Sequence, residues 1–490
     1  MKPIKVEEII NATGGVLLCG RKDTLIQNVV IDSREEAKKA LFVPIVGEKT
    51  DGHRYVKGAI TNGVEALFIQ KDTEFRENIL SLAKEKEVAV IEVEHTVLAL
   101  QRFASWYRSC FTLPVIGITG SVGKTTTKEM IASALETKKS VLKTIGNKNS
   151  QIGLPLMMFY LDDFHEVAVI EMGMSEVGEM KNLALVAKPE CAVMTNIGVA
   201  HIAQLGSQEA IRREKLAITN EFLEGSVLFV NGNDKLLAET VTQITQNEIT
   251  IDCTTTTKEA LAKTTPITYG IGEGFTYSAK KIRTTEQGIC FTVCYKEQEE
   301  LVEFLVQLKV YGEHNVLNAL AAIAVANHLG IDTKTAISGL EQYEPIAMRG
   351  QIKKVDGVTW IDDTYNASPD SMKSGANVLL SIAGKRHIAI FADVLELGEC
   401  SEQLHREVGA YLASLKKNDK MVDILITVGE QAAFLAKEAK QCGLQQISSF
   451  SSNPEASAYL KELLQEGDVV LVKGSRGMKT EEIIKACLEK

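Results

Sequence analysis

Residues 114–131, PVIGITGSVGKTTTKEMI, decide the fold of the chain around them. A short apolar strand at 115–118 runs into a glycine turn, which is followed by an amphipathic helix. Gly120 and Gly123 let successive backbone N–H groups turn inward toward an anion, and the positive end of the helix dipole adds to this attraction. The sequence therefore predicts a phosphate-binding loop.

The residues of this loop indicate a nucleotide site. Lys124 would reach the β- and γ-phosphates, and the Thr125 hydroxyl would bind magnesium. The strict pattern GxxxxGK[ST] needs glycine at position 118, where the chain has Ile118, with Gly117 one place early. A glycine-rich turn with an incidental lysine is the alternative, but it does not account for the strand and the helix on either side. We predict an ATP or GTP enzyme whose nucleotide contacts Thr119, Gly120, Ser121, Val122, Gly123, Lys124, Thr125 and Thr126.

Length and composition place the chain among soluble globular proteins. Its 490 residues are too many for one hydrophobic core, so about three domains are expected. Hydrophobic residues make up 45% of the chain and charged residues 24%, which are ordinary values. The net charge of −10 argues against a nucleic-acid partner, but it allows one small anion held by local lysines and backbone amides.

The N-terminal sequence and the cysteines favour the cytoplasm. The start, MKPIKVEEIINATGG, has glutamates where a secretion signal needs an uninterrupted apolar region. The longest apolar run, 316–326, is too short to span a bilayer, so no membrane insertion is expected. The nine cysteines contain no CxxC pair and are expected to be free thiols. Cys290 and Cys294 would share a strand face and pack in the core; without a nearby histidine they do not indicate zinc.

Residues 1–112 are expected to form a small α/β domain, because short apolar runs alternate with helical segments. Two polar strings stand out there, DSR at 32–34 and DGH at 51–53. Asp, Ser and Gly are common in helix caps and turns. Taken alone, each string is therefore interpreted as a cap or turn rather than as a site.

Residues 113–346 alternate strand, loop and helix, beginning with the phosphate-binding loop. Further apolar strands are expected at 167–172, 191–196 and 227–231. This alternation predicts a mainly parallel sheet, whose ligands gather beyond the carboxyl ends of the strands. Residues 250–310 are rich in Thr, Tyr and Val in alternating segments, which predicts a few antiparallel strands.

Several polar residues of this region lie at element ends. Glu171 closes the run VAVIE, where the acidic residue of a Walker B strand would hold magnesium, although aspartate is more common there. His201 follows the next strand and is either structural or part of this metal site. Asn315 and Asn318 lie three apart at the start of a long apolar helix. Both could hydrogen-bond one flat polar edge such as adenine, and helix capping is the alternative for each.

Lys215 interrupts the apolar face of a helix predicted over 208–223. Ile211, Ile218 and Phe222 share this face with it. One interpretation is snorkelling, with the stem buried and the ammonium in water. The other is a lysine whose surroundings lower its pKa and make it chemically usable.

Residues 347–490, after a linker at Glu344-Pro345, are predicted to form a second doubly wound sheet. Strands are expected at 357–362, 386–391, 423–428 and 469–472. Polar strings follow these strands, and in the last of them Lys473, Ser475 and Arg476 form a second candidate for binding an anion. Since no second Walker lysine pattern occurs, one nucleotide held between two domains is the simpler expectation.

The motifs, taken in order, resemble those of the Mur ligases of peptidoglycan synthesis. The match covers nearly the whole chain in DSR, TGSVGKTTTKEM, GNKNSQIGLPL, EMGMSEVGEM, TNIGVAHI, REKLAI, YGEHNVLNALAA, MRG, DDTYNASPDSM and KGSRGM. The string DDTYNASPDSM is typical of the members that add D-alanyl-D-alanine. The chain departs from the family at Ser368, where asparagine is common, and at Ala392, where glycine is common. Neither departure removes a group with an assigned role.

This resemblance implies an N-terminal domain (1–112) that binds the UDP end of a precursor. It also implies a central P-loop ATPase domain (113–346) and a C-terminal Rossmann-like domain (347–490) that closes over the site. The implied reaction of this cytoplasmic monomer uses ATP to join D-alanyl-D-alanine to UDP-N-acetylmuramoyl-tripeptide through an acyl phosphate. The alternatives are another ligase of the superfamily, such as the third-residue-adding muramyl ligase or a folylpolyglutamate synthase, and a P-loop protein that hydrolyses ATP only to change shape.

The resemblance further implies roles for individual residues. The catalytic group would be Lys124, Lys215, His201 and Glu171. A pair of magnesium ions would be held by Thr125, Glu171, His201 and a carbamylated Lys215. The nucleotide would also contact Asn315, Asn318, Arg349 and Asp363. The UDP portion would contact Ser33 and Arg34, and this role replaces the interpretation of that string as a helix cap. The candidates for contacting the dipeptide are Tyr365, Asn366 and Arg476.

Overall fold

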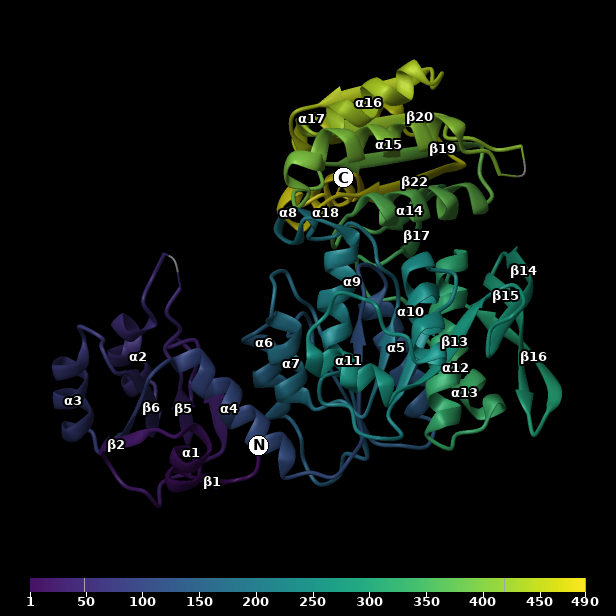
Figure 1. Ribbon diagram of the computed structural model, residues 1–490. Helices are drawn as coiled ribbons and strands as arrows, with labels where there is room; N and C mark the ends of the chain where they lie inside the picture. The colour runs from purple at the N-terminus through teal and green to yellow at the C-terminus, as the bar shows by residue number, and fades with distance from the viewer. Residues whose placement is uncertain (48, 418, 490) are drawn as a thin grey trace.

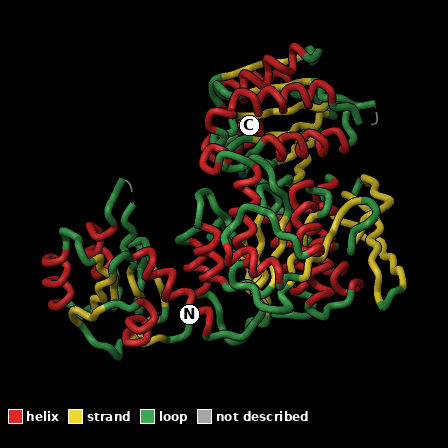
Figure 2. The backbone as a smooth tube through the Cα atoms, viewed as in Figure 1, coloured by secondary structure: helices red, strands yellow, loops and turns green. Residues whose placement is uncertain are grey.

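The computed structural model describes residues 1–47, 49–417 and 419–489, and it has the expected α/β class (Figure 1). Three domains follow one another along the chain, each built on one main sheet with helices against it (Figure 2). The predicted border after residue 112 falls between α4 (Thr96–Ser109) and β8 (Val115–Thr119). The one after residue 346 falls between α13 (Thr333–Leu340) and β17 (Gln351–Val355).

The N-terminal domain has a five-stranded sheet in the order β2-β7-β6-β5-β4. The strands β4 to β7 are parallel and β2 is antiparallel to β7. The string at 32–34 follows β4, so it lies at the carboxyl edge of the parallel strands. The strands are β1 (Ile4–Lys5), β2 (Val16–Cys19), β3 (Leu25–Ile26), β4 (Asn28–Val30), β5 (Ala40–Phe42), β6 (Ala66–Gln70) and β7 (Ala89–Val93). The helices are α1 (Val6–Thr13), α2 (Val56–Thr61), α3 (Arg76–Glu85) and α4.

Helix α4 joins the N-terminal domain to the central domain through a shared core. Phe103 and Tyr107 pack their rings on Phe159 of the central domain, with centroids 4.8 and 5.5 Å apart. Arg108 is buried and donates to three backbone carbonyls, those of Ala187 (3.0 Å), Phe111 (2.8 Å) and Leu113 (3.1 Å). One guanidinium therefore satisfies the carbonyls where the two domains meet.

The central sheet has nine strands in the order β16-β15-β14-β13-β12-β11-β8-β10-β9. Its strands β8 and β10 are buried along their whole length, as expected for parallel strands covered on both faces. The strands are β8, β9 (Val141–Lys143), β10 (Val167–Glu171), β11 (Cys191–Met194), β12 (Val227–Asn231), β13 (Thr265–Ile271), β14 (Tyr277–Thr285), β15 (Gly288–Glu297) and β16 (Glu300–Leu308). The helices are α5 (Lys124–Leu135), α6 (Gly153–Met158), α7 (Glu179–Ala187), α8 (Ile202–Leu205), α9 (Gln208–Leu216), α10 (Lys235–Gln246), α11 (Thr255–Ala262), α12 (Glu313–His328) and α13.

The prediction of antiparallel strands over 250–310 is only partly right. Strands β14, β15 and β16 are antiparallel neighbours, but β13 pairs in parallel with both β12 and β14. Helix α11 lies between β12 and β13 in the chain, so the crossover arrangement continues one strand further than the composition suggested. Strand β11 ends at Met194, two residues earlier than predicted.

The C-terminal domain has a six-stranded sheet in the order β17-β18-β22-β19-β20-β21, parallel except for β17. The four predicted strands correspond to β18, β19, β20 and β22. The edge strands β17 and β21 were not predicted, because their sequences QIKKV and QISSF are largely polar. The strands are β17, β18 (Val358–Asp362), β19 (Arg386–Ala392), β20 (Ile424–Val428), β21 (Gln446–Phe450) and β22 (Asp468–Lys473). The helices are α14 (Pro369–Ser381), α15 (Ser401–Ser414), α16 (Ala432–Gln441), α17 (Asn453–Leu463) and α18 (Glu481–Leu488).

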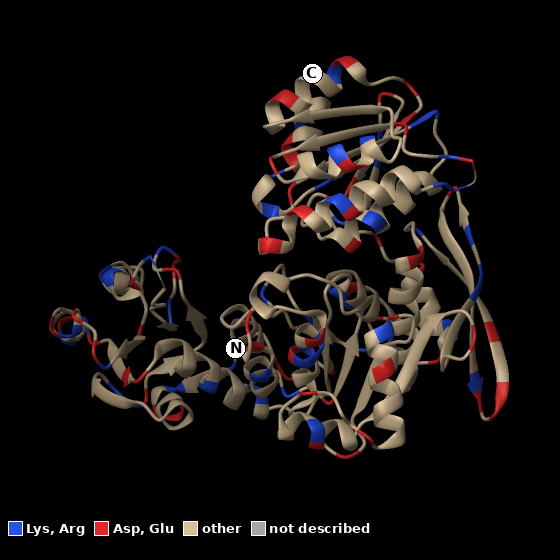
Figure 3. Cartoon of the chain, turned by 45° about the horizontal axis from the view of Figure 1, so that its top comes forward, with Lys and Arg blue, Asp and Glu red and all other residues tan. Residues whose placement is uncertain are grey.

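The surface and the cysteines complete the description. Acidic and basic residues are interspersed along all three domains (Figure 3). All nine cysteines are free thiols, as predicted. Within the described residues, no helix combines the length and apolar character needed to cross a membrane.

We predict that Arg108→Ala weakens the joint between the first two domains. The change leaves buried carbonyls without a donor, which costs about 3 kcal/mol and should lower the melting temperature by about 5 °C or more. Differential scanning calorimetry would measure it. The matched control is Arg102→Ala, since Arg102 is an exposed residue of the same helix with one bond of 3.3 Å to the Thr13 carbonyl. Equal melting temperatures for the two variants would contradict this role of Arg108.

Candidate active site

A cavity of about 590 Å³ lies between the central and C-terminal domains. The phosphate-binding loop, the carboxyl ends of β10 and β11 and the start of α12 form its central-domain wall. Loops at the strand ends of the C-terminal sheet form the other wall. The predicted site residues that line it are Ser121, Val122, Gly123, Lys124, Thr125, Thr126, Glu171, His201, Asn315, Asn318, Arg349, Asp363, Tyr365, Asn366 and Arg476.

The phosphate-binding loop has the glycine geometry that the sequence predicts. Gly120 has a φ of 149°, and a Cβ there would lie 1.8 Å from Thr195 Oγ1, so no larger residue fits. Helix α5 begins directly after Gly123, which has a φ of 89°. Lys124 Nζ donates to the Gly120 carbonyl (2.7 Å), and burial lowers the pKa of this lysine.

Asn196 fixes the shape of this loop from the end of β11. Its Oδ1 accepts hydrogen bonds from the backbone N–H groups of Ser121 (3.1 Å) and Val122 (2.9 Å). Its Nδ2 donates to the Val122 carbonyl (3.2 Å). The loop backbone is therefore held by a side chain of the neighbouring strand end. Thr119 and Gly120, predicted to contact the nucleotide, are buried and do not line the cavity.

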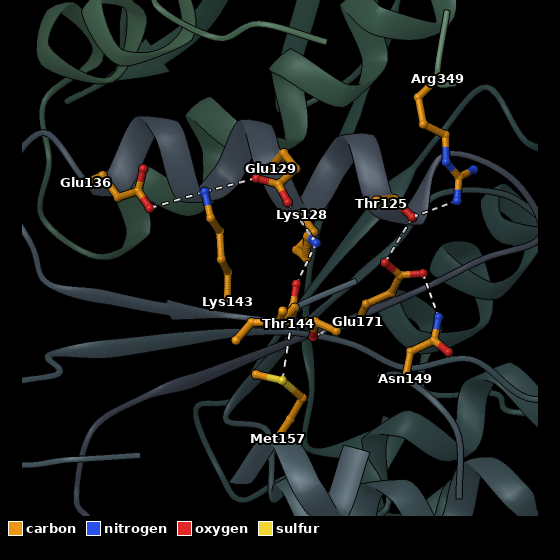
Figure 4. A network of polar contacts seen from close by, with 11 residues as sticks. Thr125, Lys128, Glu129, Glu136, Lys143, Thr144, Asn149, Met157, Glu171 and Arg349 are labelled. Carbon is orange, nitrogen blue, oxygen red and sulfur yellow. Dashed lines mark hydrogen bonds and ion pairs between the residues drawn. The ribbon is translucent and has the colours of Figure 1, made fainter. Parts of the chain in front are cut away.

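Glu171 is the centre of a polar network beside the loop (Figure 4). This carboxylate is 3% exposed and accepts from Thr125 Oγ1 (3.0 Å) and from Asn149 Nδ2 (2.8 Å). Arg349 Nη2, from the C-terminal side, donates to Thr125 Oγ1 (3.2 Å). A carboxylate and a hydroxyl at the phosphate end of a nucleotide site are oxygen ligands of the kind that Mg²⁺ prefers.

A second set of bonds in Figure 4 holds α5 against the sheet. Lys128, which is buried, donates to the Thr144 carbonyl (2.7 Å) and pairs with Glu129 (2.8 Å). The hydroxyl of Thr144 accepts from the Glu171 backbone N–H (2.9 Å). These contacts link α5 to the strand that carries the carboxylate, and so they fix Thr125 relative to Glu171.

Lys215 is fully buried on α9, with 1% of its surface exposed. The snorkelling interpretation is therefore wrong, because the ammonium does not reach water. Burial, and then the charge of Lys124, hold the pKa of Lys215 well below its ordinary value. The described part of the chain offers its Nζ no hydrogen bond and no ion pair within 4 Å. The predicted helix over 208–223 ends at Leu216 and continues as a 3-10 turn, Ala217–Thr219.

His201 lies at the start of α8 with a left-handed backbone, φ 63°. Burial and the charges of Lys215 and Lys124 lower the pKa of His201 to about 4, so its imidazole is neutral at neutral pH. Its Nδ1 lies 3.3 Å from Glu396 Oε2 of the C-terminal domain. A neutral imidazole that lines the cavity can offer a nitrogen to a metal ion.

Asn315 and Asn318 share one face of α12, as predicted, and both line the cavity. Asn318 Nδ2 donates to Asn315 Oδ1 (3.0 Å), and Asn318 Oδ1 accepts from Thr127 Oγ1 (2.9 Å). The capping alternative is wrong for both, because the N-cap of α12 is Gly312.

All three side chains of the second anion-binding candidate, on the C-terminal wall, already have a protein partner, which for Arg476 is Glu481 (2.8 Å). Lys473 Nζ donates to Asp363 Oδ2 (2.6 Å) and to the Asn366 carbonyl (2.9 Å), so its charge is already neutralised. Ser475 Oγ accepts from a backbone N–H at 3.1 Å. Arg476 faces the cavity, with its guanidinium 6.0 Å from the centre of the Tyr365 ring.

The string at 32–34 lies outside this cavity, at the edge of the N-terminal sheet. Arg34 pairs with Asp32 (2.6 Å) and its guanidinium lowers the pKa of that carboxyl to about 2. The Ser33 carbonyl accepts from Asn62 Nδ2 (2.7 Å). The cap interpretation of the string at 51–53 is confirmed, since the Asp51 side chain accepts from the His53 N–H at 2.9 Å.

Three residues of the site were not predicted by the sequence analysis. Asn149 and Asn196 belong to the quoted motifs GNKNSQIGLPL and TNIGVAHI, and each follows a strand, which was the available signal. Glu396 belongs to a loop of the C-terminal domain, FADVLELG, whose contact with His201 depends on how two domains meet. A contact between two domains cannot be predicted from a local sequence pattern.

Comparison with known proteins agrees with this geometry. The family model described as "Mur ligase middle domain" matches residues 118–326, "Mur ligase, glutamate ligase domain" matches 348–476, and "Mur ligase family, catalytic domain" matches 25–108. The UDP-N-acetylmuramoyl-tripeptide--D-alanyl-D-alanine ligase of Bacillus subtilis (strain 168) is 36% identical over 471 residues, 96% of this chain and 94% of the relative. The chain belongs to the Mur ligase family.

The fold of this Mur ligase is also similar to those of solved structures. A crystal structure of MurF from Acinetobacter baumannii, 30% identical, has a TM-score of 0.86 over 100% of both chains. The MurF ligase from Thermotoga maritima in complex with ADP, 27% identical, has a TM-score of 0.78 over 96% of this chain and 99% of that one. The three-domain architecture of the present chain is that of these Mur ligases.

We predict that Asn196→Ala weakens nucleotide binding. The loop would lose three hydrogen bonds that hold its backbone, so the Kd for ADP should rise about tenfold. Isothermal titration calorimetry would measure it. The matched control is Gln208→Ala, because Gln208 Nε2 donates to the Ile197 carbonyl (3.0 Å) next to Asn196 without touching the loop. An unchanged Kd in Asn196→Ala would show that the loop keeps its shape by itself.

Proposed function

We propose that this Mur ligase joins D-alanyl-D-alanine to UDP-N-acetylmuramoyl-tripeptide, with ATP converted to ADP and phosphate. One observation carries the proposal: the string at 362–372, typical of the dipeptide-adding members, lines the same cavity as the phosphate-binding loop. Asp363, Tyr365 and Asn366 supply the C-terminal wall, opposite Lys124 and Thr125. The activity named for the Bacillus subtilis relative supports the same choice.

The nucleotide site of this proposal combines both walls of the cavity. The loop amides and Lys124 would hold the phosphates, and Asn315 and Asn318 would face the adenine. Arg349 and Asp363 would close on the nucleotide from the C-terminal side. The hydrogen bond from Arg349 to Thr125 and the ADP complex of the Thermotoga maritima relative support this arrangement.

The chemistry follows from the weakness of a carboxylate as an acyl donor. A carboxylate oxygen of the tripeptide attacks the γ-phosphorus of ATP, and ADP leaves. The dipeptide amine then attacks the acyl carbon, loses a proton, and expels phosphate that keeps the former carboxylate oxygen. Lys124 would stabilise the charge on the transferred phosphoryl group in the first step.

The proposal includes magnesium held by Thr125, Glu171, His201 and a carbamylated Lys215. Magnesium, when bound, neutralises charge on the phosphate oxygens and orients them. No group of three His, Cys, Asp or Glu side chains able to hold a metal occurs in the described residues, and a carbamate on Lys215 would add an anionic ligand to Glu171. Lys215 is suited to this reaction, because its buried amine has a lowered pKa and CO₂ would convert it into a carboxylate.

The remaining expectations concern the other substrate and the compartment. Ser33 and Arg34, at the carboxyl edge of the N-terminal sheet, would contact the uridine diphosphate portion. Tyr365, Asn366 and Arg476 are the candidates for the dipeptide. Free thiols throughout the chain are compatible with a monomer that works in the cytoplasm.

An oxygen-18 transfer experiment tests the reaction. Tripeptide precursor labelled in its terminal carboxylate, incubated with ATP and D-alanyl-D-alanine, should give inorganic phosphate that carries one labelled oxygen, as read by mass spectrometry. Lys124→Ala supplies the blank, because loss of the phosphate-binding ammonium should abolish turnover. Unlabelled phosphate from the wild-type protein would rule out the acyl phosphate.

The choice of amine separates the alternatives. We expect phosphate release only with D-alanyl-D-alanine as acceptor. Release with a free amino acid but not with the dipeptide would point to another ligase of the superfamily. Release without any amine would point to a protein that hydrolyses ATP to change shape.

We predict that Lys215→Ala loses activity that short carboxylates in the buffer partly restore. The added carboxylate would occupy the place of the carbamate and return the missing ligand. The measurement is turnover with and without added acetate or formate, with Lys124→Ala as the control that no carboxylate rescues. Full activity of Lys215→Ala without any addition would remove the carbamate from the proposal.

A further inference from the structure

The segment that carries His201 is held between the phosphate-binding loop and the C-terminal domain. On one side, the Gly198 N–H donates to Ser121 Oγ (2.9 Å). On the other side, a Cβ at Gly198 would lie 2.4 Å from Asp370 Oδ2, and one at Gly398 would lie 2.8 Å from the Ala203 side chain. Contacts this close mean that the C-terminal domain rests directly on the backbone around His201.

Apolar packing fixes the same contact. Val199 and Ile202 pack against the main core of the C-terminal domain, together with its buried Leu397. Leu397 adjoins Glu396, so the packing of Leu397 in this core fixes the backbone next to the Glu396 carboxylate. This carboxylate lines the cavity and lies 3.3 Å from His201 Nδ1.

The charges around His201 are arranged on two sides. Lys124 and Lys215 approach from the central domain, and Glu396 is the carboxylate on the C-terminal side. Within the residues that the structure describes, His201 Nε2 has no hydrogen bond. A histidine that binds a metal through one ring nitrogen usually donates the N–H of the other to a carboxylate, which fixes the ring and its tautomer. Such contacts are often long before substrates bind and shorten in the complex.

We propose that Glu396 is a positioning residue for the magnesium site. It accepts the Nδ1–H of His201 and leaves Nε2 as the nitrogen available to the metal. This inference rests on the proposed role of His201 as a metal ligand and deepens it: the metal site is complete only when the C-terminal domain is docked. Closure of the domain and metal binding then favour one another.

Metal affinity tests this role without measuring turnover. The probe is Mn²⁺, titrated into the full-length protein saturated with ADP, with free Mn²⁺ followed by electron paramagnetic resonance. Glu396→Ala should weaken Mn²⁺ binding about 10- to 100-fold, the range found when the hydrogen-bond partner of a metal-binding histidine is removed. Glu396→Gln should stay within about threefold of wild type, because its amide oxygen still accepts the Nδ1–H.

Two further variants keep the result interpretable. Glu399→Ala removes an exposed carboxylate from the same loop, away from the cavity, and should leave the affinity unchanged. His201→Ala should lose at least as much affinity as Glu396→Ala. Melting temperatures within about 2 °C of wild type would show that the variants are folded.

The outcomes separate this inference from the function on which it rests. If Glu396→Ala binds Mn²⁺ as tightly as wild type while His201→Ala does not, the positioning role is wrong and the metal role of His201 stands. If Glu396→Gln is as weak as Glu396→Ala, the carboxylate acts by its charge and the positioning role is also wrong. If His201→Ala binds normally, both the metal role of His201 and the positioning role fail.

Discussion

The parallel pairing of β8 with β10 and β11 is the constraint on which the site depends. In this register Glu171 lies opposite Ile118, and Met194 lies opposite Thr119. The three strands therefore end together, and each continues into a polar segment at the same edge of the sheet. The phosphate-binding loop, the buried carboxylate and the asparagine that shapes the loop all meet there. A shift of register by one residue would turn Glu171 to the other face of the sheet.

Lysine and histidine side chains are buried at this edge of the sheet, which is unfavourable for their charged forms and lowers their pKa values. Burial lowers the pKa of both Lys124 and Lys215, and the charge of Lys124 lowers that of Lys215 further. Among the described residues, only Lys124 has a hydrogen-bond partner for its ammonium. A buried, unpaired ammonium is unfavourable, so the amine form of Lys215 is favoured. The same burial keeps the imidazole of His201 neutral. A neutral imidazole and an amine with a lowered pKa are the forms that the proposed metal binding and carbamylation would use.

The sequence predicted the parts of the structure that follow from local patterns. Buried runs such as VAVIE and glycine turns such as the one at 120 depend on neighbours in the chain, so strands and loop were expected where they lie. Contacts across domains could not be predicted in this way. Lys473 was a candidate for binding an anion, but it is paired with Asp363, which is 110 residues away in the chain. Glu396 meets His201 only because the two domains dock. The polar edge strands β17 and β21 lacked the apolar run that identifies a buried strand.

The core shared through α4 has a consequence for the newly made protein. The cluster of buried residues that contains Ile4 and Phe103 also contains Leu183 and Leu261, so one of the two cores of the N-terminal domain is completed by the central domain. During translation, the face of α4 that packs against the central domain stays exposed to water until α6 and α7 have left the ribosome. The first two domains therefore mature as one unit during synthesis, whereas the C-terminal domain, with separate cores, can fold after them.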